Sequence, residues 1–190
     1  MRMFSEKEKT PLEGLFMRET KTFADERGFL AELSFGGSAS DIFLEKGIGN
    51  MLAAVASTQG VPRGGHYHLT SYENSWTMQG SALWYFRDLD PASSTYKKSA
   101  AFLLGEKSVA LPEELGVLDH TLERRGSIVQ MYLSPLIYHL LIPLIAPVVF
   151  FETASRPYDE KDYMRIPFED IDDELLKGIR RHFVQVKSSK

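Results

Sequence analysis

The stretch that decides the fold runs from Gly60 to Gly80 and reads GVPRGGHYHLTSYENSWTMQG. Side chains two residues apart in an extended strand point to the same face, so His66 and His68 can present both imidazoles to one point. A turn through residues 69–72 would let Glu73 approach from the returning strand of a β-hairpin. Imidazole and carboxylate groups together suit divalent first-row metals, and sets with open positions are typical of catalytic metal centres. The spacing therefore predicts a metal site; the plainer alternative is a pair of strand histidines that only form hydrogen bonds.

A fourth ligand is expected from a distant segment. Residues 132–143 read YLSPLIYHLLIP, a strand-forming apolar run in which His139 is conspicuous. His139 is therefore the candidate for the fourth ligand. A single histidine in an apolar strand is also often a core residue with its hydrogen bonds satisfied, and both interpretations stay open.

Both segments resemble the cupin superfamily. Its first motif is Gly, five residues, His-x-His, three or four residues, Glu, six residues and Gly, and residues 60–80 match every fixed position. The second motif is matched in part, because His139 fits while Leu136 and Pro143 stand where glycine and asparagine are usual. The resemblance implies an all-β fold, the double-stranded β-helix or cupin jelly roll. It also implies a divalent metal (Zn, Fe, Mn or Ni), no organic cofactor, and ligand roles for His66, His68, Glu73 and His139.

A narrower resemblance covers about residues 15–170. FADERGFLAE at residues 23–32, VPRGGH at 61–66 and YLSPLIYH at 132–139 recur in this order in the dTDP-4-dehydrorhamnose 3,5-epimerase branch of the cupins. This resemblance implies an isomerase or epimerase that acts on a dTDP-linked 4-keto-6-deoxy sugar. Such an enzyme removes a proton next to the ketone and belongs to nucleotide-sugar and polysaccharide biosynthesis.

The resemblance also implies substrate-binding residues. Family arginines near the first two segments help to hold the pyrophosphate, and the matching positions are Arg27 and Arg63. Arg27 can equally be a turn residue paired with a neighbouring acid, and Arg63 an ordinary surface arginine. Trp84 could stack on a base or sugar, and Tyr138 could supply a phenol, although both are first of all core aromatics.

The chain departs from this branch at three points. The family has a lysine where Glu73 stands, a tyrosine on the strand equivalent to residues 148–152 where this chain has phenylalanine, and a C-terminal Lys-Asp segment for which we assign no counterpart. His66 and His139 are the predicted catalytic residues, with His66 as the base because an imidazole pKa near neutrality suits proton abstraction. A bound metal would replace the missing lysine in stabilising the enolate.

Two other functions stay open. The histidine and carboxylate set favours a metal-dependent cupin oxygenase with open sites for substrate and dioxygen. A cupin that binds a sugar or nucleotide without turnover is the third possibility. The isomerase is preferred because its motifs span most of the chain, while metal ligation is compatible with both enzymes.

Composition limits the partners. The 190 residues suit one domain over 1–190, and 43% hydrophobic with 25% charged residues is ordinary for a globular protein. The net charge of -4 gives no general attraction to nucleic acid, and the absence of cysteine excludes disulfides and thiolate sites. The amino terminus lacks the apolar core of a signal peptide, and the apolar run 140–151 is far shorter than the ~20 residues needed to span a bilayer. We therefore expect a cytoplasmic protein without membrane contact.

Strand signals dominate the rest of the chain. Strands are predicted at 29–35, 81–87, 127–133 and 147–152, with the run 140–151 as two buried strands or one bent strand. Helices are predicted near 38–46 and over about 170–183, where acidic residues begin the segment and basic residues end it. Because a jelly roll leaves strand edges that need cover, and family members pair through amino-terminal strands, a homodimer through residues before Gly28 is expected.

Overall fold

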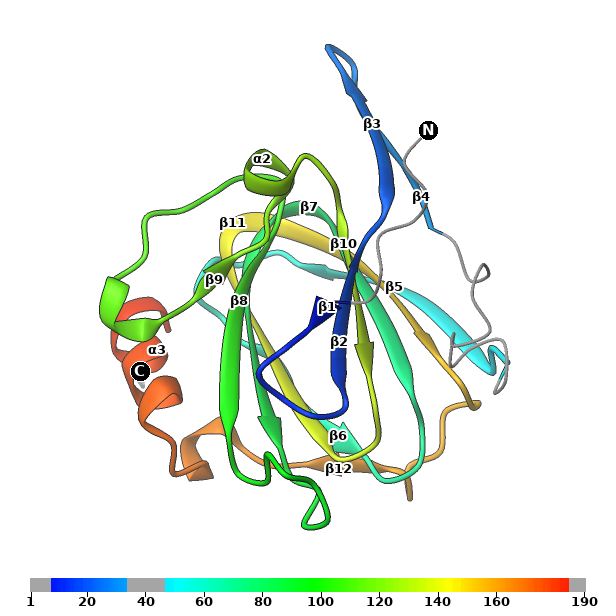
Figure 1. Ribbon diagram of the computed structural model, residues 1–190, viewed down its shortest axis with the longest axis vertical. Helices are drawn as coiled ribbons and strands as arrows, with labels where there is room; N and C mark the ends of the chain where they lie inside the picture. The colour runs from blue at the N-terminus through cyan, green and yellow to red at the C-terminus, as the bar shows by residue number, and fades with distance from the viewer. Residues whose placement is uncertain (1–7, 34–46, 185–190) are drawn as a thin grey trace.

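The computed structural model describes residues 8–33 and 47–184, and the helix expected over 38–46 lies outside the described residues. Strands make up most of this structure, as the sequence predicts (Figure 1). The strands are β1 Glu8–Lys9, β2 Leu15–Glu19, β3 Lys21–Asp25, β4 Gly28–Glu32, β5 Asn50–Ala56, β6 Arg63–His68, β7 Glu73–Asp88, β8 Ser99–Gly105, β9 Leu118–Asp119, β10 Val129–Leu133, β11 Ile137–Ala154 and β12 Tyr163–Arg165. The helical elements are η1 Glu113–Leu115, α2 Leu122–Arg125, η2 Phe168–Asp170 and α3 Glu174–Phe183.

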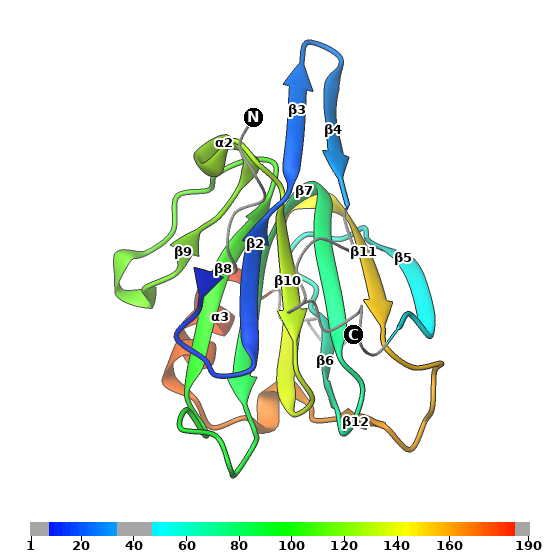
Figure 2. The ribbon, with the colours of Figure 1, turned by 45° about the vertical axis from the view of Figure 1, so that its right-hand side comes forward.

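Two long strands, β7 and β11, run through both layers of a jelly roll. The first half of β7 pairs with β10 and the second half with β8, while the first half of β11 pairs with β6 and the second half with β5. One layer therefore contains β1, β2, β10, the first half of β7, the second half of β11 and β5, and we call it the β5 layer. The β6 layer contains β9, β8, the second half of β7, the first half of β11, β6 and β12. Figures 1 and 2 show how the two layers curve around a common interior.

The bend in β7 lies at Gly80, and β11 bends beside it. Gly80 has a φ of 69°, in the left-handed region that favours glycine, and an added Cβ would lie 2.3 Å from the carbonyl oxygen of Ile145. The pairing of β11 with β7 shifts register between Pro143 and Phe150. The apolar run 140–151 is thus one bent strand, which was one of the two predicted forms.

The core lies between the layers, and a second apolar cluster lies outside the β6 layer. Along β7, Trp84 and Phe86 point between the layers, whereas Leu83 and Tyr85 point outward. The outward residues pack with β11 side chains against helix α3, including the fully buried Leu176. Because both faces of the β6 layer are covered there, β8 and the parts of β7 and β11 in this layer are apolar along most of their length, whereas β6 and β12 are not.

Helix α3 confirms the predicted C-terminal helix, with a later start. The side chain of Asp173 accepts a hydrogen bond from the backbone N–H of Leu176 at 2.9 Å and caps the helix. Arg87 of β7 donates to the same carboxylate at 2.8 Å, which fixes the helix to the β6 layer. Of the predicted helical residues before Asp173, Asp170 ends the short 3₁₀ helix η2, and residues 171–172 are not helical.

Strands β3 and β4 form a hairpin that projects from the barrel, as Figures 1 and 2 both show. Its side chains Phe23 and Leu30 are 53% and 68% exposed. None of the helices in the described ranges is long and apolar enough to cross a membrane.

We expect Gly80→Ala to destabilise the protein by more than about 2 kcal/mol, since it combines backbone strain with overlap against the backbone of β11. Gly126→Ala is the matched control, because Gly126 also has a positive φ, 74°, but an added Cβ meets nothing within 4 Å. The control should lose only about 1 kcal/mol from strain. Urea unfolding of both variants measures the difference, and equal losses would contradict the role of the bend.

Candidate functional site

A cavity of about 500 Å³ opens between the two layers, and its two walls carry different chemistry. The β6 layer contributes the three imidazoles of His66, His68 and His139. The β5 layer contributes the carboxyl groups of Glu73 and Glu152. Basic and acidic groups from distant parts of the chain therefore face one another across the cavity.

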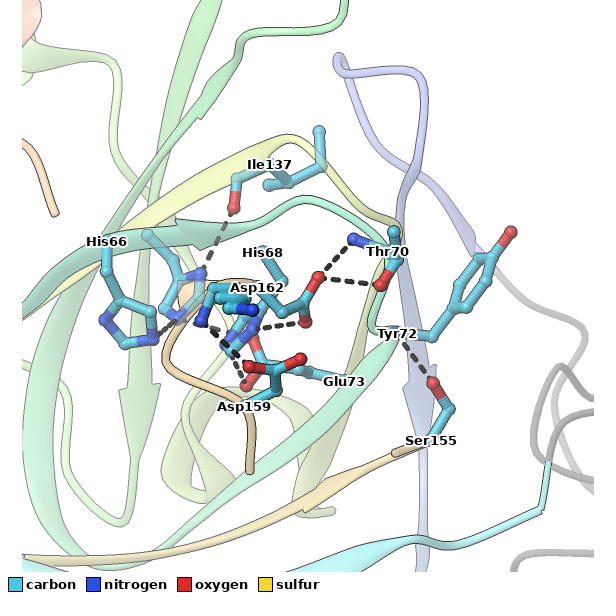
Figure 3. Close-up of polar contacts among 11 residues, drawn as sticks. His66, His68, Thr70, Tyr72, Glu73, Ile137, Ser155, Asp159 and Asp162 are labelled. Atoms are coloured by element: carbon cyan, nitrogen blue, oxygen red, sulfur yellow. Dashed lines mark hydrogen bonds and ion pairs between the residues drawn. The ribbon is translucent and has the colours of Figure 1, made fainter. Parts of the chain in front are cut away.

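The four predicted metal ligands come together here. The Nε2 atoms of His66 and His139 lie 3.0 Å apart. The carboxylate of Glu73 lies 3.2 Å from His68 Nε2 and 3.4 Å from His139 Nε2. Figure 3 shows His66, His68 and Glu73 arranged around one region of the cavity.

The prediction of a β-hairpin is wrong, although His66, His68 and Glu73 do lie close together. Strand β6 pairs with β11 and β12, and its His66 lies opposite His139 in the register with β11. Residues 69–72 carry the chain from the β6 layer to the β5 layer, so Glu73 faces the imidazoles across the cavity instead of along a shared ladder. A local motif does not distinguish a hairpin turn from a connection between layers.

Asp162 is a site residue that the sequence analysis missed. Its carboxylate lies 3.1 Å from Nδ1 of His68 and accepts hydrogen bonds from the backbone N–H and hydroxyl of Thr70 at 2.6 and 2.7 Å (Figure 3). Burial would raise the pKa of Asp162, but hydrogen bonds from Ser71, Thr70 and His68 lower it to about 2. The signal for Asp162 in the sequence was the dipeptide Lys161-Asp162. It is a C-terminal Lys-Asp segment, the feature of the family pattern for which the sequence analysis assigned no counterpart. Its aspartate contacts His68, the second histidine of the motif.

The three imidazoles differ in charge. Burial alone would lower the pKa of His68, but its contacts with Glu73 and Asp162 outweigh burial and raise it. Burial lowers the pKa of His66 strongly, with further contributions from the charges of His139 and His68, and burial also lowers the pKa of His139. His68 is thus a cation between two carboxylates near neutral pH, while His66 and His139 are neutral.

Hydrogen bonding assigns the tautomers of the neutral pair. Nδ1 of His139 lies 3.2 Å from the carbonyl oxygen of Ile137, which can only accept, so Nδ1 carries the proton. Nε2 of His139 is then a lone pair, and it accepts a hydrogen bond from Nε2–H of His66. The two rings share one proton between facing nitrogens and retain the capacity to accept another.

The donor set fits a divalent metal. One ligand atom from each of His66, His68 and Glu73 lies within 4.8 Å of the others, and His139 adjoins two of them. Asp162 occupies the outer position that commonly orients a metal-binding histidine through its second nitrogen. Nitrogen and carboxylate donors suit Zn, Fe, Mn or Ni, and His68 would have to lose a proton to bind any of them.

Glu152 is a second residue that the sequence analysis missed. It lies on β11 opposite Ser75 of β7, and Glu73 lies opposite Ala154 in the same ladder, so the two glutamates are diagonal neighbours on one face. Burial raises the pKa of Glu152 to about 8, and the nearby charge of Glu73 adds to the effect. A lone acidic residue at the end of the apolar run 147–152 was the available signal.

The predicted substrate-binding residues divide into two groups. Arg63 and Trp84 line the cavity, and the indole N–H of Trp84 donates to Thr77 at 3.0 Å. Tyr138 belongs to the cluster outside the β6 layer, where its hydroxyl donates to the carbonyl of Ile166, because it precedes His139 by one residue and therefore points to the opposite face. Its predicted place at the substrate is wrong.

Arg27 also lies away from the cavity of its own chain. It stands at the end of the projecting β3–β4 hairpin, where its Nε lies 3.2 Å from both carboxylate oxygens of Asp25. The pair is exposed, so it contributes little to stability. The turn interpretation of Arg27 therefore describes this structure.

Comparison with known proteins identifies the fold. No family model and no curated protein matches the sequence. Among solved structures, dTDP-4-dehydrorhamnose 3,5-epimerase from Elizabethkingia anophelis is 21% identical with a TM-score of 0.62, over 88% of this chain and 82% of that one. The Mycobacterium tuberculosis epimerase is 17% identical with a TM-score of 0.64, over 90% and 76%. A dTDP-6-deoxy-D-glucose-3,5-epimerase from Legionella pneumophila, in complex with dTDP-4-keto-L-rhamnose, is 20% identical with a TM-score of 0.63, over 89% and 83%.

These similarities extend over most of the chain and show a shared fold. The predicted all-β jelly roll with a C-terminal helix is confirmed. The chain has the cupin-type fold found in dTDP-4-dehydrorhamnose 3,5-epimerases.

Proposed function

We propose that this protein is an isomerase or epimerase that acts on a dTDP-linked 4-keto-6-deoxy sugar by removing a proton next to the ketone. The observation that carries the proposal is the cavity in which the neutral His66–His139 pair stands beside the cationic His68. The Legionella structure of similar fold holds a keto-sugar nucleotide of this class. Such an enzyme would serve nucleotide-sugar biosynthesis in the cytoplasm.

The roles of the imidazoles follow from their charges. A base must be neutral before it accepts a proton, and His66 and His139 satisfy this condition together. The reason given from the sequence for His66 is wrong, however, because burial lowers its pKa far below neutrality and so makes it a weaker base than a free imidazole. His68 carries the positive charge that an enolate oxygen needs, and Glu73 and Asp162 hold that charge in place. In the family pattern a lysine, at the position of Glu73 in this chain, supplies this positive charge. In this chain His68 would supply it instead.

The cavity also offers groups for the rest of a nucleotide-sugar. Arg63 lies at the cavity on β6 and can form a bidentate contact with phosphate. Trp84 and Leu141 from the β6 layer and Phe150 from the β5 layer give the cavity an apolar part that could contact the sugar ring.

A metal-dependent cupin oxygenase is the second candidate, and the histidine and carboxylate donor set favours it. We propose that His66, His68, Glu73 and His139 can bind a divalent metal in place of the proton on His68. When bound, the metal would act as a Lewis acid toward an oxygen in the cavity.

The function is tested by exchange with D₂O. The wild-type protein should place deuterium next to the ketone of a dTDP-4-keto-6-deoxyhexose, as mass spectrometry and NMR measure, because an enolate is reprotonated from solvent. His66→Asn should lower the exchange rate about 100-fold or more, and Arg63→Ala should act mainly on KM. His182→Asn is the control, since His182 lies on α3 outside the cavity. No exchange with several such sugars, with or without divalent metal, would refute the isomerase.

Metal binding should release a proton. Because contacts with Glu73 and Asp162 raise the pKa of His68, its ring holds a proton more firmly than a free imidazole and must lose it to bind metal, so affinity for Zn²⁺ should fall about tenfold for each pH unit below that pKa. Titration calorimetry in buffers of different ionisation enthalpy measures the released proton. His68→Ala should weaken binding while His182→Ala leaves it unchanged, and equal affinities in the two variants would exclude this site.

We further propose a homodimer formed by the amino-terminal hairpin. The hairpin exposes Phe23 and Leu30, and within the described residues β5 is hydrogen-bonded on one side only. Pairing of two copies would cover these surfaces and bring Arg27 to the cavity of the partner, which it cannot reach in its own chain. Light scattering should give twice the mass of one chain. Leu30→Asp should shift the equilibrium to monomer, unlike Leu118→Asp, whose exposed leucine lies on β9.

A further inference from the structure

Two of the three imidazoles in the cavity have a hydrogen-bond partner at Nδ1, and the third does not. Nδ1 of His139 lies 3.2 Å from the carbonyl oxygen of Ile137, and Nδ1 of His68 lies 3.1 Å from the carboxylate of Asp162. Such a contact at the second nitrogen normally sets the orientation of a functional histidine. Nδ1 of His66 is buried and has no hydrogen-bond partner among the residues that the structure describes.

The ring of His66 therefore lacks the usual restraint on its orientation. Its approach to the backbone of Gly64 falls short of hydrogen-bond geometry. Within the described ranges, the one hydrogen bond of this ring joins its Nε2 to His139. The torsion that turns an imidazole about its bond to Cβ has broad minima, so a single hydrogen bond leaves the ring plane free to tilt. A second contact is needed to hold the plane.

Tyr163 makes this second contact. Strand β12 pairs with β6 so that Tyr163 stands opposite His68 and diagonal to His66 on the same face. The phenol ring stacks on the imidazole of His66, with centroids 4.2 Å apart and planes 26° apart. It meets His68 edge-on instead, at 5.5 Å and 77°. The flat contact is thus made with the one imidazole that has no partner at Nδ1 in the described part of the chain.

The ring of Tyr163 is itself held by its neighbours. The guanidinium of Arg165, which stands opposite His66 in the ladder, lies 5.3 Å from the centroid of the phenol ring. The ring of Tyr158 lies 6.0 Å away between centroids. Cation and aromatic contacts of this kind favour one position of a half-buried ring. Tyr163 therefore offers His66 a firm flat surface.

We propose that Tyr163 is a positioning residue, whose ring fixes the plane of the His66 imidazole by stacking. A half-turn of the imidazole about its bond to Cβ would put a carbon in the place of Nε2, and the hydrogen bond to His139 selects between these two states. Stacking prevents the tilted states between them, since a tilted ring would overlap the phenol. The effect on proton removal rests on the function proposed above. The stacking acts on the ring plane whether Nε2 carries a proton, a lone pair or a metal ion.

Variants at position 163 separate the ring from its hydroxyl group. Tyr163→Phe keeps the flat face, whereas Tyr163→Leu removes it and keeps an apolar side chain. Tyr163→Thr is a second removal variant that suits a strand, and thermal melting shows which variants are folded. Tyr96→Leu is the matched control, because Tyr96 is an exposed tyrosine between β7 and β8 that does not line the cavity.

The first measurement is the order of each histidine ring, from ¹³C NMR relaxation of ring-labelled histidine. We expect Tyr163→Leu to bring the order parameter of His66 into the flexible range, below about 0.6, while His68 and His139 keep their wild-type values through their own partners. Tyr163→Phe and Tyr96→Leu should leave all three rings unchanged. An unchanged His66 ring in the folded Tyr163→Leu or Tyr163→Thr variant overturns the proposal, and so does an equal loss of order in Tyr163→Phe.

The second measurement is the rate of deuterium exchange into a dTDP-4-keto-6-deoxyhexose in D₂O. Because a misplaced base slows the chemical step more than binding, Tyr163→Leu should lower kcat for exchange about tenfold or more and change KM by less than about twofold. Tyr163→Phe should keep most of the wild-type rate. A rise in KM alone would make Tyr163 a substrate-binding residue and overturn the proposal. Wild-type protein without any exchange refutes the proposed function, and the ring order of His66 then still decides whether Tyr163 positions it.

Discussion

The structure depends on two strands that each belong to both layers. Because β7 and β11 pair with different partners before and after their bends, each of these strands joins the two layers directly. The apolar side chains between the layers fill one part of this space, and the cavity occupies the rest. The same arrangement puts imidazoles on one wall and carboxyl groups on the other, since β11 alone delivers His139 to the first wall and Glu152 to the second.

Charge balance within the cavity follows from this geometry. Placing three carboxyl groups and three imidazoles around a poorly solvated space is costly unless their charges pair or are neutralised. His68 pairs with Glu73 and Asp162, which leaves His66, His139 and Glu152 to be neutral near pH 7. A cation and neutral acid–base groups thus coexist in one site, the combination that enolate chemistry requires.

The sequence predicts the parts of this site that obey local rules. His66 and His68 share a face because strand side chains alternate, and the motif spacing correctly brings Glu73 to them. The same alternation excludes Tyr138, whose neighbour His139 takes the inward position, so the two could not both face the cavity. Asp162 and Glu152 were not found because their positions depend on contacts between segments 94 and 77 residues apart along the chain, respectively. The β-hairpin was predicted because nearby strands usually pair, whereas here the connection passes between layers.

The hydrogen bonds of Asp162 with Thr70 and His68 have a further consequence. Through Asp162, the connection at residues 69–72 is tied to the segment before β12, and the same carboxylate holds His68. The position of residues 69–72 and the charge of His68 therefore depend on the same carboxylate. Loss of the Asp162 carboxylate would therefore release the connection at residues 69–72 from the segment before β12 and would also lower the pKa of His68.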